Sequence, residues 1–201
     1  MFKSLFLLIV LVLCGCMART SVNSMASPDN RGEQYHRILV EFPTSNLDWR
    51  KTTEQTFVER DSTFVASYAL FFPGRQYTNE EIAAIDRENG IDAILVISTE
   101  ATGISTETMP SQTSTACGAA TDGYSTAAAC ATRTTGGETY RRPWANWTTK
   151  MWDLRSGAVV WMASASTGGN AFANWHTVMH SMVGSTINKL RNDHMITNGH
   201  S

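Results

Sequence analysis

Short apolar runs alternate with amphipathic segments through the first half of the chain, and this alternation is the feature that most limits its fold. Residues 35–43 contain Ile-Leu-Val, and residues 91–97 are almost entirely apolar. Continuous runs of this kind are typical of strands buried on both faces of a sheet. Residues 64–72 alternate with period two, as a further strand would. Segments 47–61 and 78–90 separate these strands and are predicted to be helices.

Helix signals support both of these assignments. Asn46 precedes the first helical segment and is a preferred N-cap residue. Thr78 and Glu81 have the spacing of a capping box at the start of the second. Gly90 is expected to end the second helix, because glycine adopts the left-handed conformation common after a helix C-terminus.

A hairpin and a closing helix are predicted for the last third of the chain. Residues 147–154 and 158–166 are expected to be strands, joined by a turn that Asp153 starts and in which Gly157 can adopt a positive φ. Apolar residues recur at helical spacing across 172–191. The complete pattern predicts an α/β domain: a two-layer or three-layer mixed sheet of about five strands with three helices, in the order β-α-β-α-β-(long loop)-β-β-α.

Residues 101–146 interrupt this pattern. Of these 46 residues, 29 are Ala, Gly, Ser or Thr, so the segment offers little surface to bury and is predicted to be a mobile insertion. It contains Cys117 and Cys130. A disulfide between them would close a loop of about 14 residues and contribute roughly 3 kcal/mol. A reactive redox pair is the alternative, although the spacing differs from Cys-x-x-Cys.

The N-terminus has the anatomy of a secretion signal. Lys3 precedes the apolar run Leu5–Leu13, which is too short to span a bilayer. Leu13, Gly15 and Cys16 match the bacterial lipobox, which predicts that Cys16 is lipidated and becomes the mature N-terminus. An ordinary signal peptide cut elsewhere is the alternative. Residue 17 is Met and not Asp, which favours the outer membrane, with the domain facing the periplasm.

Cleavage before Cys16 sets the remaining organisation. The expected parts are a signal peptide (1–15), a lipidated flexible tether (16–34), a single domain (35–195) and a frayed tail (196–201). Cys14 leaves with the signal and Cys16 carries lipid, so Cys117 and Cys130 remain in a compartment that permits disulfides. The formal net charge is −2, and the sequence lacks a basic block. We therefore expect no nucleic-acid partner.

Few residues suggest chemistry. His176 and His180 share a helix face and are a weak candidate for metal binding, with packing beside the apolar stripe as the alternative. Acidic residues near the end of the second helix are expected to be solvated surface: Asp86, Glu88 and Asp92. Neither Gly-x-Ser-x-Gly nor a phosphate-binding glycine motif occurs in the sequence, so we expect no cofactor and no catalytic residues.

A partner-binding patch is the other candidate site. It comprises Arg141, Arg142, Trp144 and Trp147, because Trp and Arg concentrate at the energetic centres of interfaces.

A family resemblance is supported by four features of the sequence, which are the lipobox, the alternating strands and helices, the closing helix and one further pattern. That pattern is Trp152, Asp153, Gly157, Val160 and Trp161. Together they resemble periplasmic lipoproteins with the fold of the TolB N-terminal domain, a group that includes the curli secretion lipoprotein and the lipoprotein activator of penicillin-binding proteins. The resemblance covers residues 36–191. It implies a role in protein–protein interactions at the envelope, without catalytic residues.

The expected function is therefore that of a lipid-anchored envelope protein, non-enzymatic, that binds or assembles an envelope protein partner. Its lipid would confine it to the membrane and raise its effective concentration for that partner. The alternative is an enzyme acting on envelope polymer, or a module that binds a small ligand or a metal.

Overall fold

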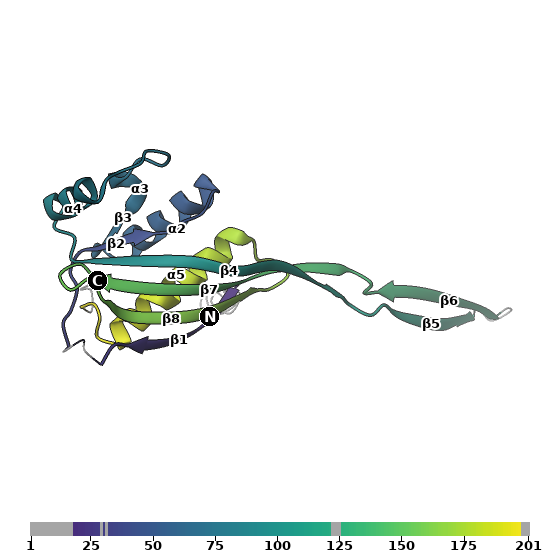
Figure 1. Cartoon of the computed structure of the whole chain (residues 1–201). Helices are drawn as coiled ribbons and strands as arrows, with labels where there is room; N and C mark the ends of the chain where they lie inside the picture. Colours follow the sequence, from purple (N-terminus) through teal and green to yellow (C-terminus); the bar gives the residue numbers. More distant parts are fainter. Residues whose placement is uncertain (1–17, 29, 31, 122–125, 198–201) are drawn as a thin grey trace, which may run out of the picture.

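The computed structural model describes residues 18–28, 30, 32–121 and 126–197, with side chains for all of these except residues 117–130. The described elements, drawn in Figure 1, are in chain order β1 (Ala18–Ala26), β2 (Ile38–Glu41), α2 (Leu47–Arg60), β3 (Phe64–Ala66), α3 (Ser67–Leu70), α4 (Asn79–Glu88), β4 (Ala93–Thr108), β5 (Gln112–Thr121), β6 (Thr126–Thr135), β7 (Thr139–Asp153), β8 (Val159–Gly169) and α5 (Trp175–Asn192).

The predicted α/β class is confirmed. One mixed sheet has the order β1-β8-β7-β4-β2-β3, and β5 pairs with β6 separately. Strand β2 runs parallel to both β3 and β4, and the other pairs are antiparallel. The described residues thus hold eight strands and four helices, where about five and three were expected.

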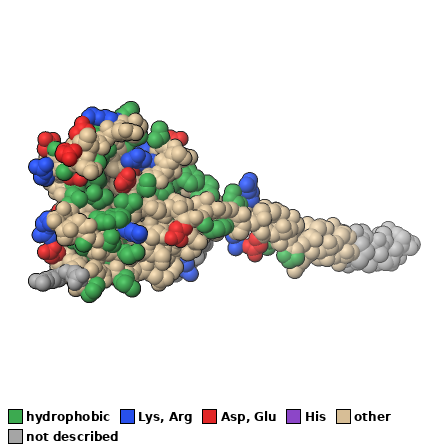
Figure 2. All heavy atoms as spheres, viewed as in Figure 1, with side chains coloured by type: hydrophobic (Ala, Val, Ile, Leu, Met, Phe, Trp, Pro, Cys, Tyr) green, Lys and Arg blue, Asp and Glu red, His purple; other side chains and the backbone are tan. Residues whose placement is uncertain are grey.

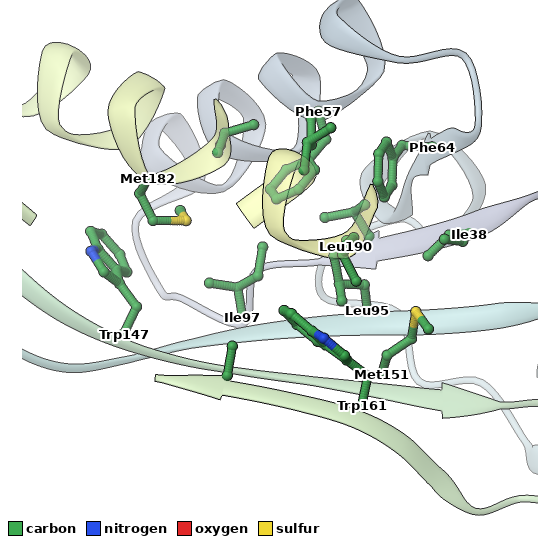
Figure 3. Packing of buried hydrophobic residues seen from close by; sticks show 14 of the residues in the cluster. Ile38, Phe57, Phe64, Leu95, Ile97, Trp147, Met151, Trp161, Met182 and Leu190 are labelled. Atoms are coloured by element: carbon green, nitrogen blue, oxygen red, sulfur yellow. The ribbon is translucent and has the colours of Figure 1, made fainter. Parts of the chain in front are cut away.

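The main core lies between one face of the sheet and helices α2 and α5. Figure 3 shows Ile97, Trp147 and Trp161 rising from the sheet toward Met182 and Leu190 of α5. Each of these five side chains is at most 1% exposed. Burial of a large apolar side chain contributes about 1.5–3 kcal/mol, so this layer is a main source of stability. The apolar stripe predicted for the closing helix is confirmed, because it supplies the buried face of α5.

Helix α4 lies against the opposite face. Neighbouring residues of a strand point to opposite sides. Ile38, Val40 and Leu95 join the main core, whereas Leu39 and Ile94 line cavities beside α4. The domain therefore has three layers at its β2–β4 end. The predicted capping box of α4 is present, and Gly90 follows the helix at φ +68°.

A carboxylate is buried on the core side of α2. Glu54 is fully buried, and its oxygens accept hydrogen bonds from the backbone N–H groups of Phe42 and Tyr68 at 3.0 Å. Arg50 Nε and the Ser67 hydroxyl donate to the same carboxylate. A charge removed from water is tolerated when its hydrogen bonds are satisfied in this way. Glu54 therefore joins α2 to the chain before and after it.

The strand predicted over residues 64–72 is wrong in its second half. Only Phe64–Ala66 form β3, and Ser67–Leu70 form the short helix α3. The Tyr68 N–H is bonded to Glu54, and the Phe71 N–H closes the helical turn on the Ser67 carbonyl. A buried carboxylate on the preceding helix therefore outweighs the local period-two pattern.

The tether predicted over residues 16–34 is also wrong in part. Residues 18–26 form β1, which pairs with β8 along its whole length. Polar side chains made this segment look unstructured, but they are bonded inside the fold: Thr20 Oγ1 lies 2.9 Å from Thr167 Oγ1 and 2.8 Å from Ser181 Oγ. The sequence signals for residues 1–15 and Cys16 lie outside the described residues.

The start of the predicted frayed tail is packed as well. Met195 and Ile196 are each 1% exposed, and Ile196 forms a parallel bridge with Tyr35. The backbone N–H of Tyr35 also donates to the Met195 carbonyl. These contacts hold the chain after α5 against the residues that precede β2.

The predicted mobile insertion is a long hairpin. Strands β4 and β7 continue beyond the sheet as a two-stranded ribbon, and β5 and β6 extend it further (Figure 1). We call the described residues 104–121 and 126–142 the arm. Small residues bury little surface, but the two strands of an antiparallel ribbon form cross-strand backbone hydrogen bonds on their facing edges, and these bonds do not need a core. Composition alone therefore missed the arm.

Candidate functional site

The arm and its junction with the body are the first candidate site. At the junction, Trp144 of β7 pairs with Gly103 of β4. A Cβ on Gly103 would lie 2.7 Å from the Trp144 ring, so the ring covers a position that only glycine leaves free. Packing of an aromatic ring on a cross-strand neighbour stabilises a ribbon where no second sheet covers it.

Threonine pairs follow one another along the arm. The hydroxyl oxygens of Thr113 and Thr134 lie 3.2 Å apart, and those of Thr115 and Thr132 lie 3.1 Å apart. Such pairs contribute to sheet stability as directly opposed side chains. On the face drawn in Figure 2, the charged side chains of the arm lie near its base, and the described surface beyond them is mostly uncharged. Arg133 of β6 adds one exposed charge to the outer part of the arm. Period-two threonines in the sequence were a signal for this ribbon.

Pro110 and a glycine pair form a joint in the arm. Gly136 and Gly137 both have positive φ, at +93° and +80°. A Cβ on Gly136 would lie 2.4 Å from the Pro110 carbonyl oxygen. Hydrogen bonds from Met109 N–H to the Glu138 carbonyl and from Gly137 N–H to the Met109 carbonyl close the joint. The two ribbons of the arm are therefore separate sheets connected at a tight, glycine-dependent crossing.

The backbone register bears on the predicted disulfide. Cys117 and Cys130 are direct partners in the β5–β6 pairing. Directly opposed residues in an antiparallel pair have Cα atoms about 4.5–5.5 Å apart, within the range that a disulfide requires. Their side chains lie outside the described part of the structure, so the disulfide stays a prediction.

The four residues of the predicted partner patch do not form one surface. Arg141 and Arg142 are exposed, and Arg142 pairs with Glu107 across the ribbon at 2.5 Å. Trp144 is half-buried over the junction. Trp147 is only 1% exposed and donates from Nε1 to the Thr167 hydroxyl, so its place in the patch is a wrong prediction. Trp147 faces the helices because it lies an odd number of residues from Trp144 on the same strand.

The first residue of β1 lies beside the base of the arm. The first residue of β1, Ala18, pairs with Gly169, and the preceding residue of β8, Gly168, pairs with Trp144. Trp144 in turn pairs with Gly103, after which the arm begins. One row of cross-strand partners thus joins the start of β1 to the arm.

The two histidines are neighbours without a metal-binding group around them. The rings of His176 and His180 lie 4.2 Å apart between centroids, and His180 Nε2 lies 3.4 Å from Thr56 Oγ1. Burial, followed by the charges of His176 and Arg60, lowers the pKa of His180. Among the described residues, no group of three or more His, Cys, Asp or Glu side chains could hold a metal ion.

Sequence reasoning misplaced part of the acidic group after the second helix. Glu88 is exposed as expected. Asp86 is 4% exposed and faces the sheet with α4. Asp92 accepts hydrogen bonds from the backbone N–H groups of His36 and Arg37. Asp86 lies four residues after Ile82, on the apolar side of the helix, and this spacing was the available signal.

No protein-family model and no curated protein matches the sequence. In the part of the chain that the structure describes, no helix is long and apolar enough to cross a membrane. Among solved structures, the chain is similar to a PelC dodecamer from Paraburkholderia phytofirmans (14% identity, TM-score 0.46, 89% of this chain and 99% of that one). It is also similar to the lipoprotein GNA1162 from Neisseria meningitidis (15% identity, TM-score 0.39, 78% of this chain and 98% of that one). At these values the similarities establish no family, and the resemblance to the TolB N-terminal domain stays a prediction.

Proposed function

We propose that this chain is a lipid-anchored, non-enzymatic envelope protein that binds an envelope protein partner through its arm. The observation that carries the proposal is the pairing of β1 with β8, which holds Ala18, two residues after the predicted lipidation site, beside the base of the arm. Lipidation at Cys16 would leave two residue steps between the lipid-bearing residue and Ala18. Two steps of chain span at most about 7 Å. The lipid would therefore hold the base of the arm at the membrane surface.

The arm suits a binding role because its strands are paired on one side only. Among the described residues, β5 pairs with β6 alone, and β4 and β7 pair only with each other from Ile104 outward. Their outer edges present N–H and C=O groups in the way that edge strands do. An extended segment of a partner can add to such an edge through main-chain hydrogen bonds. The side chains described for β5 and β6 are exposed and many carry a hydroxyl group. No described element covers the outer edges of these two strands.

Lipid and arm would act together. From Ile104 to Thr121 the arm spans about 60 Å if fully extended, at roughly 3.3 Å per residue. An anchor at its base confines this reach to the neighbourhood of one membrane, which raises the effective concentration for a partner in that membrane. The proposed mechanism is tethered capture, with outer-membrane placement and periplasmic orientation as its expected setting.

Site-specific photocrosslinking tests this proposal in cells. A photoreactive residue at Thr115, exposed on the arm, should give a defined protein adduct, whereas one at the exposed Glu80 of α4 should give none. The Cys16→Ser chain should lose the Thr115 adduct because it is no longer held at the membrane. Equal adducts from Thr115 and Glu80 would count against the arm as the contact.

An arm deletion provides the matched control. Ser105 and Arg142 are direct partners, so an Asn-Gly turn can join them in place of residues 106–141. This variant should retain the lipid and the body while losing the partner. Retention of the same partner by the deleted chain would contradict the proposed function.

A further inference from the structure

A cavity outside the arm lies between α4 and the outer face of the sheet. It has a volume of about 520 Å³, and its apolar walls include Ile82, Ile91, Ile94 and Leu154. A neighbouring hollow of about 330 Å³ shares Ile82 and Ile94 with it. Volumes of this size are typical of small-molecule sites. The lining combines these apolar side chains with five polar ones, which are Asn79, Asp86, Arg87, Asp92 and Arg155.

One polar group in this cavity has no partner. Only 4% of the surface of Asp86 is exposed. Its Oδ1 atom accepts no hydrogen bond within the described structure. Its carboxylate also has no ion pair among the described residues. Burial raises the pKa of Asp86. A buried acceptor without a donor costs free energy, so the fold alone gives no reason for a carboxyl group here.

Neither of the two arginines that line the cavity forms an ion pair with Asp86. Arg155, at the rim of the cavity, pairs with Glu33 and Asp153. Arg87 donates from Nε to the Ala83 carbonyl of its own helix. Asp86 also lies in the last turn of α4, where the helix dipole disfavours a negative charge. Local electrostatics thus add a second cost to the burial of Asp86.

We propose that this cavity binds a small amphipathic amine, whose ammonium group donates to the Asp86 carboxylate while its apolar part packs on Ile82 and Ile94. An ammonium supplies both the missing hydrogen-bond donor and the missing opposite charge, and charge-assisted hydrogen bonds are stronger than neutral ones. The apolar walls accept a short alkyl or aromatic group. This site is separate from the arm and does not depend on the arm's function.

A pair of matched probes tests the proposal on the full chain. 2-Phenylethylammonium should bind saturably in NMR titrations, with shifts concentrated on α4 and the start of β4. The neutral isostere 2-phenylethanol should bind at least tenfold more weakly, because it lacks the charge. No saturable binding of the amine, or equal binding of the two probes, would overturn the proposal.

Variants assign the binding to Asp86. Asp86→Asn should weaken amine binding at least tenfold, and its folding is expected to be retained because an unpaired charge is removed. Glu88→Gln, an exposed acid on the same helix, should leave binding unchanged. Ile94→Phe should block the cavity from the sheet side and reduce binding with Asp86 still present. Unaltered affinity in both Asp86→Asn and Ile94→Phe would place any amine binding elsewhere and reject the site.

Discussion

Ala18 opens β1 directly opposite Gly169, the last residue of β8. This pairing makes Ala18 part of the sheet, so the start of β1 cannot move independently of the base of the arm. A polar segment that composition assigns to a tether is instead an edge strand. Its stability depends on hydrogen bonds from side chains such as Thr20, which joins β1 to β8 and α5.

Replacing Thr20 by valine tests this attachment. The change keeps the side-chain shape and removes hydrogen bonds to Thr167 and Ser181, so the free energy of unfolding should fall by about 1 kcal/mol. Urea denaturation measures the loss. Ser21→Ala is the control, because Ser21 is exposed on the other face of β1, and it should change stability by less than about 0.5 kcal/mol. A Thr20→Val chain as stable as the native one would argue against a structured β1.

Gly103→Ala should disturb the base of the arm. The new Cβ would meet the Trp144 ring at 2.7 Å, so the ring must move, at a cost of about 1–3 kcal/mol. The indole N–H signal of Trp144 in NMR spectra should shift, and arm amides should exchange faster. Gly168→Ala is the matched control for Gly103→Ala. Gly168 also pairs with Trp144, but a Cβ added at Gly168 would have no atom within 4 Å. Similar spectra for both variants would contradict the packing described.

Cys117 and Cys130 should form a disulfide when the chain is exported to an oxidising compartment. Their direct pairing across the ribbon makes closure possible without moving the backbone, and the bond should stabilise the hairpin by roughly 3 kcal/mol. Alkylation under native oxidising conditions, followed by peptide mass spectrometry, should find both thiols blocked. A Cys117→Ser, Cys130→Ser double variant should show faster amide exchange across β5 and β6. Two freely alkylated thiols in the native chain would refute the bond.

Asp193 should make stability fall in acid. Burial acts to raise its pKa, but hydrogen bonds from Ser24, Trp161 and Lys189 outweigh burial and hold the pKa below 3.8. A group whose pKa is lowered on folding stabilises the native state above its unfolded pKa, and this contribution is lost as pH falls through the folded value. Asp193→Asn should therefore cost about 1.5–3 kcal/mol at pH 7, because charged hydrogen bonds are removed.

The pH profile separates this carboxylate from a general loss of packing. The stability difference between the native chain and Asp193→Asn should shrink as pH falls below 3.8, where the native carboxyl becomes protonated. Denaturation curves across this window provide the comparison. Glu88→Gln serves as an exposed reference. A difference that is constant with pH would show that the Asp193 charge contributes nothing.

Signals that act within a few residues were predictive. Asn46 caps α2 by accepting from the Trp49 N–H, and Thr78 and Glu81 cap α4 as their spacing indicated. Gly157 adopts φ +68° in the turn between β7 and β8. These features depend on local hydrogen bonds and backbone sterics, which the sequence specifies directly. Which strands pair with each other in the sheet depends on residues far apart in the chain, so short sequence patterns do not specify the pairing.

By itself, the sequence determined the α/β class, the starts of α2 and α4 and the apolar faces of β2, β4 and α5, because each follows from local spacing. Only the tertiary structure decided that residues 18–26 form a strand, that residues 104–121 and 126–142 form an arm, and that Asp86 is buried. The physical reason is shared by all three. Hydrogen bonds to β8 and across the ribbon satisfy backbones that have little apolar surface, and the position of α4 over the sheet excludes water from a carboxyl group that composition assigns to the surface.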